Sequence, residues 1–138
     1  MYSRVYVEIT NVCNKSCSFC PKTRRAPHST TIEEFDKTKR SPAFMSKEQF
    51  ECVTNKLRTL TNYIYLHVMG EPLLHPDVAE LIRSATNKGL KCAITTNGTL
   101  IGEKGDALID AGVYKVNISL HRFQDADETA HRKYVSAC

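Results

Sequence analysis

The sequence predicts an α/β fold in which parallel strands alternate with outer helices. Apolar segments rich in β-branched and aromatic residues alternate along the chain with segments whose apolar residues recur at helical spacing. Such alternation implies right-handed helical crossovers between parallel strands. The length of 138 residues and the hydrophobic content of 41% fit one globular domain. We expect about four strands in a core over 1–123, forming part of a barrel or an open doubly wound sheet, and a polar tail at 124–138.

The first strand is predicted at 4–9, where the sequence reads RVYVEI, and a cysteine-containing loop follows it. The polar stretch at 22–42 is long for a connection in a compact domain, so we interpret it as a functional loop or an insertion. Ser46 and Gln49 are placed to form a capping box at the start of a helix, which should run to about Leu60.

The second strand is predicted at 63–68, and the turn-like sequence MGEPLLHPD follows it. A second helix comes next and ends near Gly89, where we expect a left-handed cap. Its buried face is marked by Val78, Leu81, Ile82 and Ala85.

A third strand, a short helix and a fourth strand complete the alternation. The third strand is predicted at 90–95, and the third helix at 104–111, where Gly112 ends it. The fourth strand is predicted at 114–120. Cys92 alternates with apolar neighbours in the third strand, so we place its side chain in the core.

Three cysteines in the loop CNKSCSFC are the strongest chemical signal: Cys13, Cys17 and Cys20. A four-iron four-sulfur cluster usually has four cysteine ligands, so a cluster held by three keeps one iron open to another ligand. A buried helical face of cysteines is disfavoured by the polar residues between them and by Pro21 after them. Zinc is the alternative metal, with a fourth ligand from His28, Cys52 or Cys92.

The sequence shows neither a targeting segment nor a membrane span. Met1 leads directly into the first strand without a basic region and an apolar stretch, and no segment approaches the ~20 apolar residues of a membrane span. We therefore expect a cytoplasmic protein without membrane contact. Its six cysteines should be reduced thiols or metal ligands.

The formal net charge of +4 is small, but basic residues gather close to the cysteine loop. One interpretation is a docking surface for an acidic electron-transfer protein or for nucleic acid. The other is a solvated loop, because acidic residues interrupt the basic run. The basic residues concerned are Lys15, Lys22, Arg24, Arg25, Lys37, Lys39 and Arg40.

Polar or metal-binding residues follow the end of every predicted strand. In parallel α/β sheets, ligands bind at the carboxyl ends of the strands, so these residues should converge on one site. Besides the cysteines they are Thr10, Asn11, Met69, Gly70, Glu71, Thr95, Thr96, Asn97, Asn117, Ser119 and His121.

At these residues the chain resembles the radical S-adenosylmethionine (radical SAM) superfamily. The loop CNKSCSFC has the CxxxCxxC pattern of that family, with Phe19 as the aromatic residue before the last cysteine. MGEP is similar to the family's GGE motif, with Met69 in place of the first glycine, and TTNG and ISLH come later in the expected order. The resemblance covers nearly all of the chain through His121.

The resemblance implies two cofactors, a four-iron four-sulfur cluster and SAM. It implies that Cys13, Cys17 and Cys20 hold three irons, while the amino and carboxylate groups of SAM chelate the fourth. It also implies that Glu71 receives the SAM amino group and that the exposed backbone around Gly70 lets SAM approach closely.

Weaker assignments follow from the same resemblance. Ser119 and Asn97 are expected to contact the SAM carboxylate or ribose, and the backbone beside Phe19 to touch the adenine. Asn117 and His121 are candidates for facing the substrate, although satisfied polar residues at strand ends are an equally good interpretation of both.

The implied activity is reductive cleavage of SAM to a 5′-deoxyadenosyl radical that abstracts a hydrogen atom from a substrate. A low-potential electron donor such as flavodoxin or ferredoxin is implied, with the basic loop as a docking site. The sequences HVMGEPLLHP and TTNG are similar to maturase-like members, which favours peptide or protein modification. The alternatives are a non-catalytic iron-sulfur binding module and a zinc-stabilised nucleic-acid-binding domain.

The chain departs from the family pattern on its C-terminal side. Family members commonly continue to a fifth and a sixth strand, which we do not find before the polar tail. The fourth strand would then have an unpaired edge, and such edges invite association. We expect a truncated protein, a fragment or a partial barrel completed by another chain, with truncation able to abolish activity.

Overall fold

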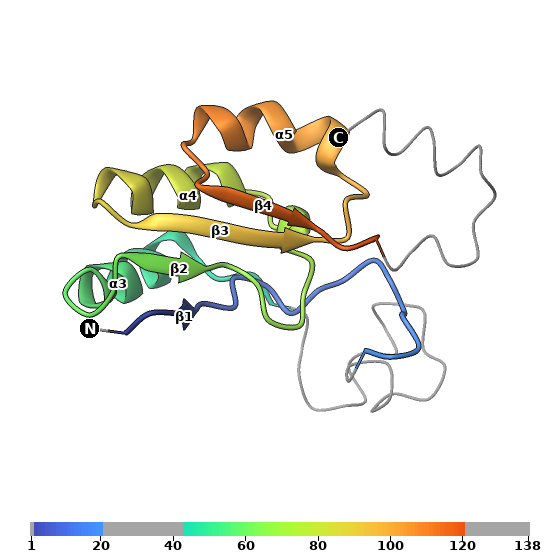
Figure 1. Ribbon diagram of the computed structural model, residues 1–138, viewed down its shortest axis with the longest axis horizontal. Helices are drawn as coiled ribbons and strands as arrows, with labels where there is room; N and C mark the ends of the chain where they lie inside the picture. Colours follow the sequence, from blue (N-terminus) through green and yellow to red (C-terminus); the bar gives the residue numbers. More distant parts are fainter. Residues whose placement is uncertain (1, 21–42, 121–138) are drawn as a thin grey trace.

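The structure of the protein, a computed structural model, describes residues 2–20 and 43–120 (Figure 1). These two stretches contain four strands, three α-helices and one short 3-10 helix, and strands and helices alternate along them. Several predictions lie outside the described residues: those for the 22–42 stretch, His28, His121, the 124–138 tail and the basic residues beyond Lys15.

All four strands run parallel in one sheet, in the order β1-β2-β3-β4. Tyr65 in β2 lies opposite Tyr6 in β1 on one side and opposite Ala93 in β3 on the other. This confirms the predicted α/β fold with four parallel strands, which is consistent with part of a barrel. The strands are β1 (Val5–Tyr6), β2 (Tyr63–Tyr65), β3 (Lys91–Thr96) and β4 (Lys115–Ile118).

β1 is shorter than the strand predicted at 4–9. Beyond β1 the chain pairs with the segment that leads into the first helix, instead of continuing along β2. Thr10 forms an antiparallel bridge with Phe44, and Met45 N donates to Ile9 O over 2.8 Å. The predicted length was wrong because apolar alternation does not reveal which segment an edge strand will pair with.

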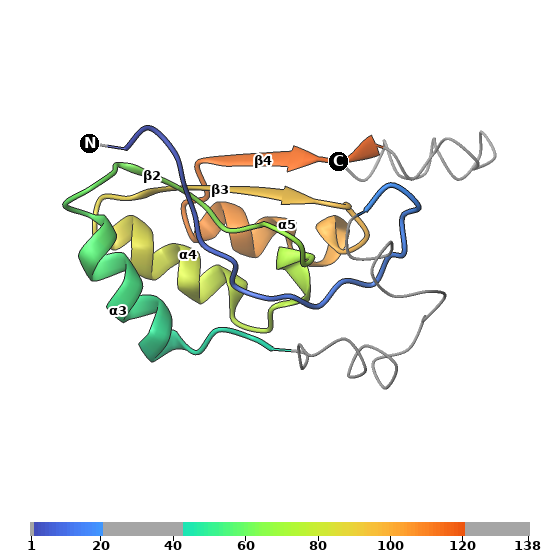
Figure 2. The same cartoon turned by 90° about the horizontal axis from the view of Figure 1, so that it is seen from below.

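The three helices lie on the same face of the sheet, as Figure 2 shows. The capping box predicted for the first of them is confirmed: Ser46 N donates to Gln49 Oε1 over 2.9 Å, and Gln49 N donates to Ser46 Oγ over 3.2 Å. None of the helices in the described part of the chain has the length and hydropathy of a membrane span. The helices are α3 (Lys47–Leu57), α4 (Val78–Asn87) and α5 (Ile101–Asp110).

The helix ends differ from the predicted ones by about a turn, as helix termini often do. α3 ends at Leu57 rather than at Leu60, whose N–H donates to Leu57 O over 2.8 Å and closes a turn. α5 begins at Ile101, earlier than predicted. Gly89 and Gly112 have φ values of 82° and 80°, which confirms left-handed caps after α4 and α5.

The hydrophobic core fills the space between the sheet and the helices. Phe50 of α3 and Leu81 of α4 are at most 1% exposed, and Ile64 and Ile94 of the sheet are fully buried. Cys92 is also fully buried in this core, as predicted, and burial raises the pKa of its thiol to about 12. Cys92 is therefore a core side chain, and among the described residues it belongs to no group of His, Cys, Asp or Glu that could hold a metal ion.

Within the described residues, no helix covers the other face of the sheet (Figure 2). Aromatic rings line it: Tyr6 stacks on Tyr65 at 4.9 Å between centroids, and Tyr63 meets Tyr114 edge-on at 5.0 Å. The alternation of side chains along β2 explains why the two faces of the sheet differ, because Tyr63 and Tyr65 point to this face while Ile64 points to the core. β4 is one edge of the sheet, and the predicted self-association through it stays a prediction.

Candidate functional site

The segment that follows β1 and contains the CNKSCSFC loop passes the carboxyl ends of the other strands (Figure 1). All three cysteines of the loop are partly exposed. Cys20 N donates to Cys17 O over 3.0 Å, which closes a turn within the loop. Thr10 anchors the loop at its start, because its buried hydroxyl donates to Ala43 O (2.9 Å) and accepts from Val12 N (3.1 Å).

The loop gathers three thiols without assembling a metal centre. In residues 2–20 and 43–120, no three His, Cys, Asp or Glu side chains are arranged to hold a metal ion. The other two described cysteines lie in different elements, Cys52 exposed on α3 and Cys92 in the core. Among the described residues, the loop therefore offers three thiols as potential ligands, and no fourth protein ligand joins them.

Gly70 brings the loop after β2 into backbone contact with the cysteine loop. A Cβ at Gly70 would lie 2.0 Å from Thr10 O, closer than any van der Waals contact allows. The next residue, Glu71, donates its N–H to Val12 O over 2.7 Å. Only glycine fits at this position, as expected where two backbones approach closely.

Glu71 is a buried carboxylate at the centre of the strand ends. It is 3% exposed and caps the 3-10 helix η2 (Pro72–Leu74). Its Oε1 accepts hydrogen bonds from Leu73 N (3.0 Å) and from Thr96 Oγ1 (2.6 Å), and its Oε2 accepts one from Asn97 N (2.7 Å). The carboxylate therefore ties the loop after β2 to the end of β3, and it is not a solvated loop residue.

The turn after β3 is also tied to the cysteine loop, through side chains. Asn97 Nδ2 donates to Asn14 Oδ1 (2.8 Å), and Asn14 Nδ2 donates to Thr99 Oγ1 (3.0 Å). The Thr99 hydroxyl donates to Asn97 Oδ1 (2.7 Å), which closes a cycle of three hydrogen bonds. We call these three side chains the amide clasp. Sequence reasoning missed Asn14, because no local pattern reveals a partner 83 residues away.

The remaining predicted residues lie at the end of β4 or in the cysteine loop. Ser119 directly follows β4, and its N–H donates to Thr96 O over 2.8 Å. Asn117 donates weakly to Thr95 Oγ1 at 3.4 Å. Phe19 is 53% exposed in the cysteine loop. Their predicted contacts with SAM and with substrate stay predictions.

Two polar residues at the strand ends were not predicted. Glu8 Oε1 accepts a hydrogen bond from Met69 N (2.9 Å), which joins the chain after β1 to the loop after β2. His67 Nδ1 accepts one from Thr95 N (3.0 Å), and burial lowers the pKa of His67. The imidazole is therefore neutral at pH 7 with its proton on Nε2. The available signal was a polar residue within each apolar segment, RVYVEI and YIYLHV.

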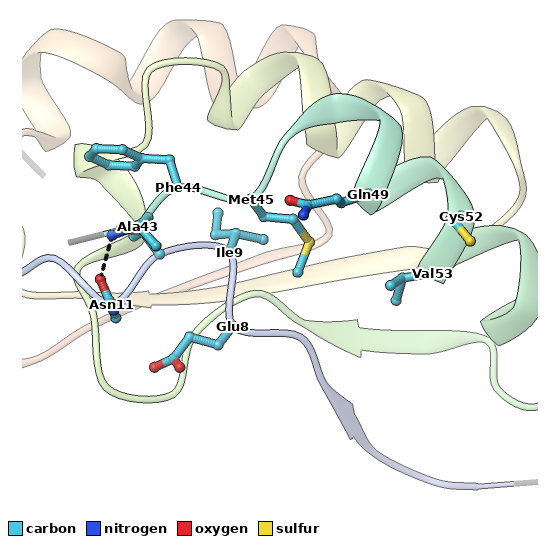
Figure 3. Close-up of a pocket in the computed structure, with 10 residues that line it drawn as sticks. Glu8, Ile9, Asn11, Ala43, Phe44, Met45, Gln49, Cys52 and Val53 are labelled. Atoms are coloured by element: carbon cyan, nitrogen blue, oxygen red, sulfur yellow. Dashed lines mark hydrogen bonds between the residues drawn. The ribbon is translucent and has the colours of Figure 1, made fainter. Parts of the chain in front are cut away.

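A groove lies between the chain after β1 and the start of α3 (Figure 3). Asn11 Oδ1 accepts a hydrogen bond from Ala43 N over 2.8 Å at one end of it. Figure 3 shows the Glu8 carboxylate pointing away from Cys52 and Val53. Thr10 and Asn11, two of the predicted strand-end residues, line the groove, as does Cys52, whereas Cys13, Cys17, Cys20, Glu71, Asn97 and Ser119 do not.

Known proteins resemble this chain in sequence over most of its length. The model of the family described as the Radical SAM superfamily matches residues 7–136. An AdoMet-dependent heme synthase of Oleidesulfovibrio alaskensis is 32% identical over 114 residues, which are 82% of this chain and 26% of that protein. A GTP 3′,8-cyclase of Chlorobaculum tepidum is 35% identical over 118 residues, which are 84% of this chain and 32% of that protein. The chain thus spans only about a quarter to a third of these relatives.

Solved structures show the same fold. BtrN in complex with AdoMet and 2-DOIA has a TM-score of 0.71 and 23% sequence identity, and the match covers 96% of this chain and 50% of that one. SeMet BtrN in an open conformation has a TM-score of 0.70 and 22% identity, and the match covers 96% of this chain and 59% of that one. At these identities the likeness concerns the fold.

Proposed function

Because the chain belongs to the radical SAM superfamily, whose members bind a four-iron four-sulfur cluster and SAM, we propose that it binds both cofactors at its strand ends. One structural observation supports the proposal in addition to family membership. The loops that follow β1, β2 and β3 are joined by hydrogen bonds into one unit around the cysteine loop. We infer that the chain is a radical SAM enzyme or the cofactor-binding part of one.

The residues at the strand ends fit these cofactors. Thiolates are the usual ligands of iron-sulfur clusters, and three of them leave one iron open for SAM. Gly70 supports this arrangement, because its lack of a side chain lets the loop after β2 pack against the backbone of Thr10 and Val12. The proposed cluster ligands are Cys13, Cys17 and Cys20.

We assign SAM to the residues that surround this loop. Glu71 Oε2 accepts one protein hydrogen bond and Oε1 accepts two, so Oε2 is the atom proposed to meet the SAM amino group. Ser119 and Asn97 are proposed to contact the carboxylate or ribose of SAM. The backbone beside Phe19 is proposed to meet the adenine.

When bound, the reduced cluster supplies the electron that cleaves SAM to methionine and a 5′-deoxyadenosyl radical, which takes a hydrogen atom from the substrate. The chain itself holds the thiolates, orients SAM and shields the site from water. Lys15, between two of the cysteines, is proposed to help dock an acidic low-potential donor such as flavodoxin or ferredoxin. We propose a cytoplasmic location, because a reducing compartment keeps the thiols available.

For the substrate we propose a peptide or a protein, on the similarity of HVMGEPLLHP and TTNG to maturase-like members. Two relatives are named for heme synthesis and for GTP cyclisation, so GTP is the first alternative to assay. Stimulation of SAM cleavage by a peptide library and not by GTP is the expected result.

The deciding experiment measures 5′-deoxyadenosine after anaerobic iron and sulfide reconstitution with dithionite and SAM. The native chain is compared with Cys17→Ala and with Cys52→Ala, which removes an exposed cysteine from α3. We expect product from the native chain and from Cys52→Ala, and none from Cys17→Ala. Equal product from all three chains would contradict the assignment of the cluster ligands.

A non-catalytic iron-sulfur binding module is the second candidate. It would need only the three thiols of the cysteine loop and the residues that hold this loop in place. Iron and sulfide analysis together with SAM binding separate the two: a loaded brown protein that binds SAM but forms no 5′-deoxyadenosine supports the module. A colourless protein with one zinc and salt-dependent RNA binding would support the zinc alternative instead.

A further inference from the structure

From the geometry of the amide clasp we infer that Asn14 is a positioning residue, which fixes the cysteine loop to the Glu71-anchored end of β3. The clasp is the cycle formed by the side chains of Asn14, Asn97 and Thr99. The test of this inference that uses the cluster and SAM rests on the proposed function. The test that measures cysteine alkylation needs no cofactor.

The hydrogen bonds of the clasp are mutually consistent in donors and acceptors. Asn14 uses both ends of its amide, accepting from Asn97 Nδ2 at 2.8 Å and donating to Thr99 Oγ1 at 3.0 Å. The single hydroxyl proton of Thr99 goes to Asn97 Oδ1 at 2.7 Å, and Thr99 N donates to the same oxygen at 3.0 Å. Each polar atom thus has the partner that its chemistry requires, which fixes the orientation of both amides.

The clasp is joined to a rigid support. Asn97 N donates to Glu71 Oε2 at 2.7 Å, and Thr96 Oγ1 donates to Glu71 Oε1 at 2.6 Å. Gly98 N donates in turn to Thr96 Oγ1 at 3.0 Å, so the turn that carries Asn97 is fixed to a buried carboxylate. The partly exposed cysteine loop hydrogen-bonds to this turn. Its position is therefore fixed relative to the end of the sheet.

The cysteine loop is held at two points that bracket its first cysteine. Val12 O accepts from Glu71 N at 2.7 Å, and the Asn14 side chain enters the clasp. Cys13 lies between these two anchors, whereas Cys17 and Cys20 lie beyond the second. Loss of the clasp should therefore free Cys13 more than Cys20.

The first experiment uses the apo-protein and follows iodoacetamide alkylation of each cysteine by mass spectrometry. Asn14→Ala removes both side-chain hydrogen bonds, and Asn55→Ala on the exposed face of α3 is the matched control. From the net free energy that a hydrogen bond contributes to stability, we expect alkylation of Cys13 to become about threefold to tenfold faster in Asn14→Ala. Cys52 serves as the internal reference because it is exposed on α3 and far from the clasp in sequence.

The outcome at Cys13 decides the inference. A faster reaction at Cys13 than at Cys20 in Asn14→Ala, with native rates in Asn55→Ala, supports it. Unchanged Cys13 reactivity in Asn14→Ala overturns it. An equal rise at all cysteines, Cys52 included, also overturns it, because that result indicates general loosening of the fold.

The second experiment is a double-mutant cycle on the reconstituted protein. The rate of iron loss to a chelator and the change of the reduced-cluster EPR signal on SAM addition are measured for Asn14→Ala, Asn97→Ala and the double variant. If the two amides act as one clasp, the double variant should lose iron no faster than the worse single variant. Asn14→Asp, which keeps the acceptor for Asn97 and loses the donor to Thr99, should lie between native and Asn14→Ala.

Additive effects of the two substitutions would contradict the clasp. A native chain that takes up no cluster would contradict the proposed function instead, while the thiol measurement on the apo-protein still decides whether Asn14 holds the loop.

Discussion

The hydrophobic core and the strand ends of this protein are stabilised in different ways. The core is made of aliphatic and aromatic side chains such as Phe50, Ile64 and Leu81, which pack between the sheet and the helices. The strand ends are made of hydrogen bonds between loops, such as the bond from Thr96 to Glu71 across 25 residues of sequence. We therefore expect the core to contribute more per residue to the free energy of unfolding, and the strand ends to determine the geometry of the cysteine loop.

The largest effect on stability should come from the core. Ile64→Ala removes a fully buried side chain from β2 and leaves a cavity, which costs about 2–5 kcal/mol. Urea denaturation of the apo-protein measures this loss. Ile109→Ala on α5 is the matched control, because Ile109 is 71% exposed, and it should change the free energy of unfolding by less than about 0.5 kcal/mol.

Equal losses in these two variants would contradict the assignment of the core. If folded Ile64→Ala protein still takes up the native amount of iron, the separation between core and strand ends is confirmed as well.

A smaller loss of stability, with a larger effect on the site, is expected at Gly70. In Gly70→Ala the new methyl group would lie 2.0 Å from Thr10 O, so the two loops must move apart. Overpacking of this kind costs about 1–3 kcal/mol. Urea denaturation measures that cost, and iron uptake on reconstitution should fall together with SAM binding.

Gly105→Ala is the control for Gly70→Ala. Gly105 lies inside α5 and has open space beside it for a methyl group, so alanine should stabilise the helix by about 0.5–1 kcal/mol. A lower free energy of unfolding in Gly70→Ala and a higher one in Gly105→Ala would confirm that glycine is required at position 70 by the contact with Thr10 O and not by helix or loop propensity. The same sign for both would refute the close approach.

Glu71→Gln tests the strand ends without changing side-chain size. The glutamine oxygen can still accept from Leu73 N and Thr96 Oγ1, but its NH₂ group then faces the N–H of Asn97. Leaving buried donors unpaired costs about 1–3 kcal/mol, which urea denaturation should detect. Glu103→Gln, an exposed residue of α5, should stay within about 0.5 kcal/mol of the native chain. A neutral Glu71→Gln would contradict the central position of this carboxylate.

Sequence reasoning succeeded where the controlling interactions are local. The capping box of Ser46 and Gln49, the left-handed cap at Gly89 and the helix end at Gly112 depend on residues a few positions apart, and all were predicted. The three-cysteine loop is also a local pattern. The strand order follows from the alternation of elements, because parallel crossovers leave few topologies open.

What the sequence could not reveal depends on contacts between distant segments. The predicted strand at 4–9 was too long because Ile9 pairs with Met45. The bond from Thr96 to Glu71 spans 25 residues of sequence, and the bond from Asn14 to Thr99 spans 85. Any Asn in a polar loop has the same local appearance as Asn14, so only the fold distinguishes it.

The smallest effect is expected at His67, which lies where the uncovered face of the sheet meets the strand ends. Burial lowers the pKa of His67 in the folded chain, whereas an unfolded histidine binds a proton near pH 6.5. Below about pH 6.5 the unfolded state therefore binds more protons, and the free energy of unfolding falls until the pH passes the lowered folded pKa. His67→Gln removes this dependence while its amide oxygen can still accept from Thr95 N. Urea denaturation at about pH 7 and pH 5 should show a smaller loss in the variant than in the native chain, and equal losses would mean that His67 is as free to protonate in the folded chain as in the unfolded one.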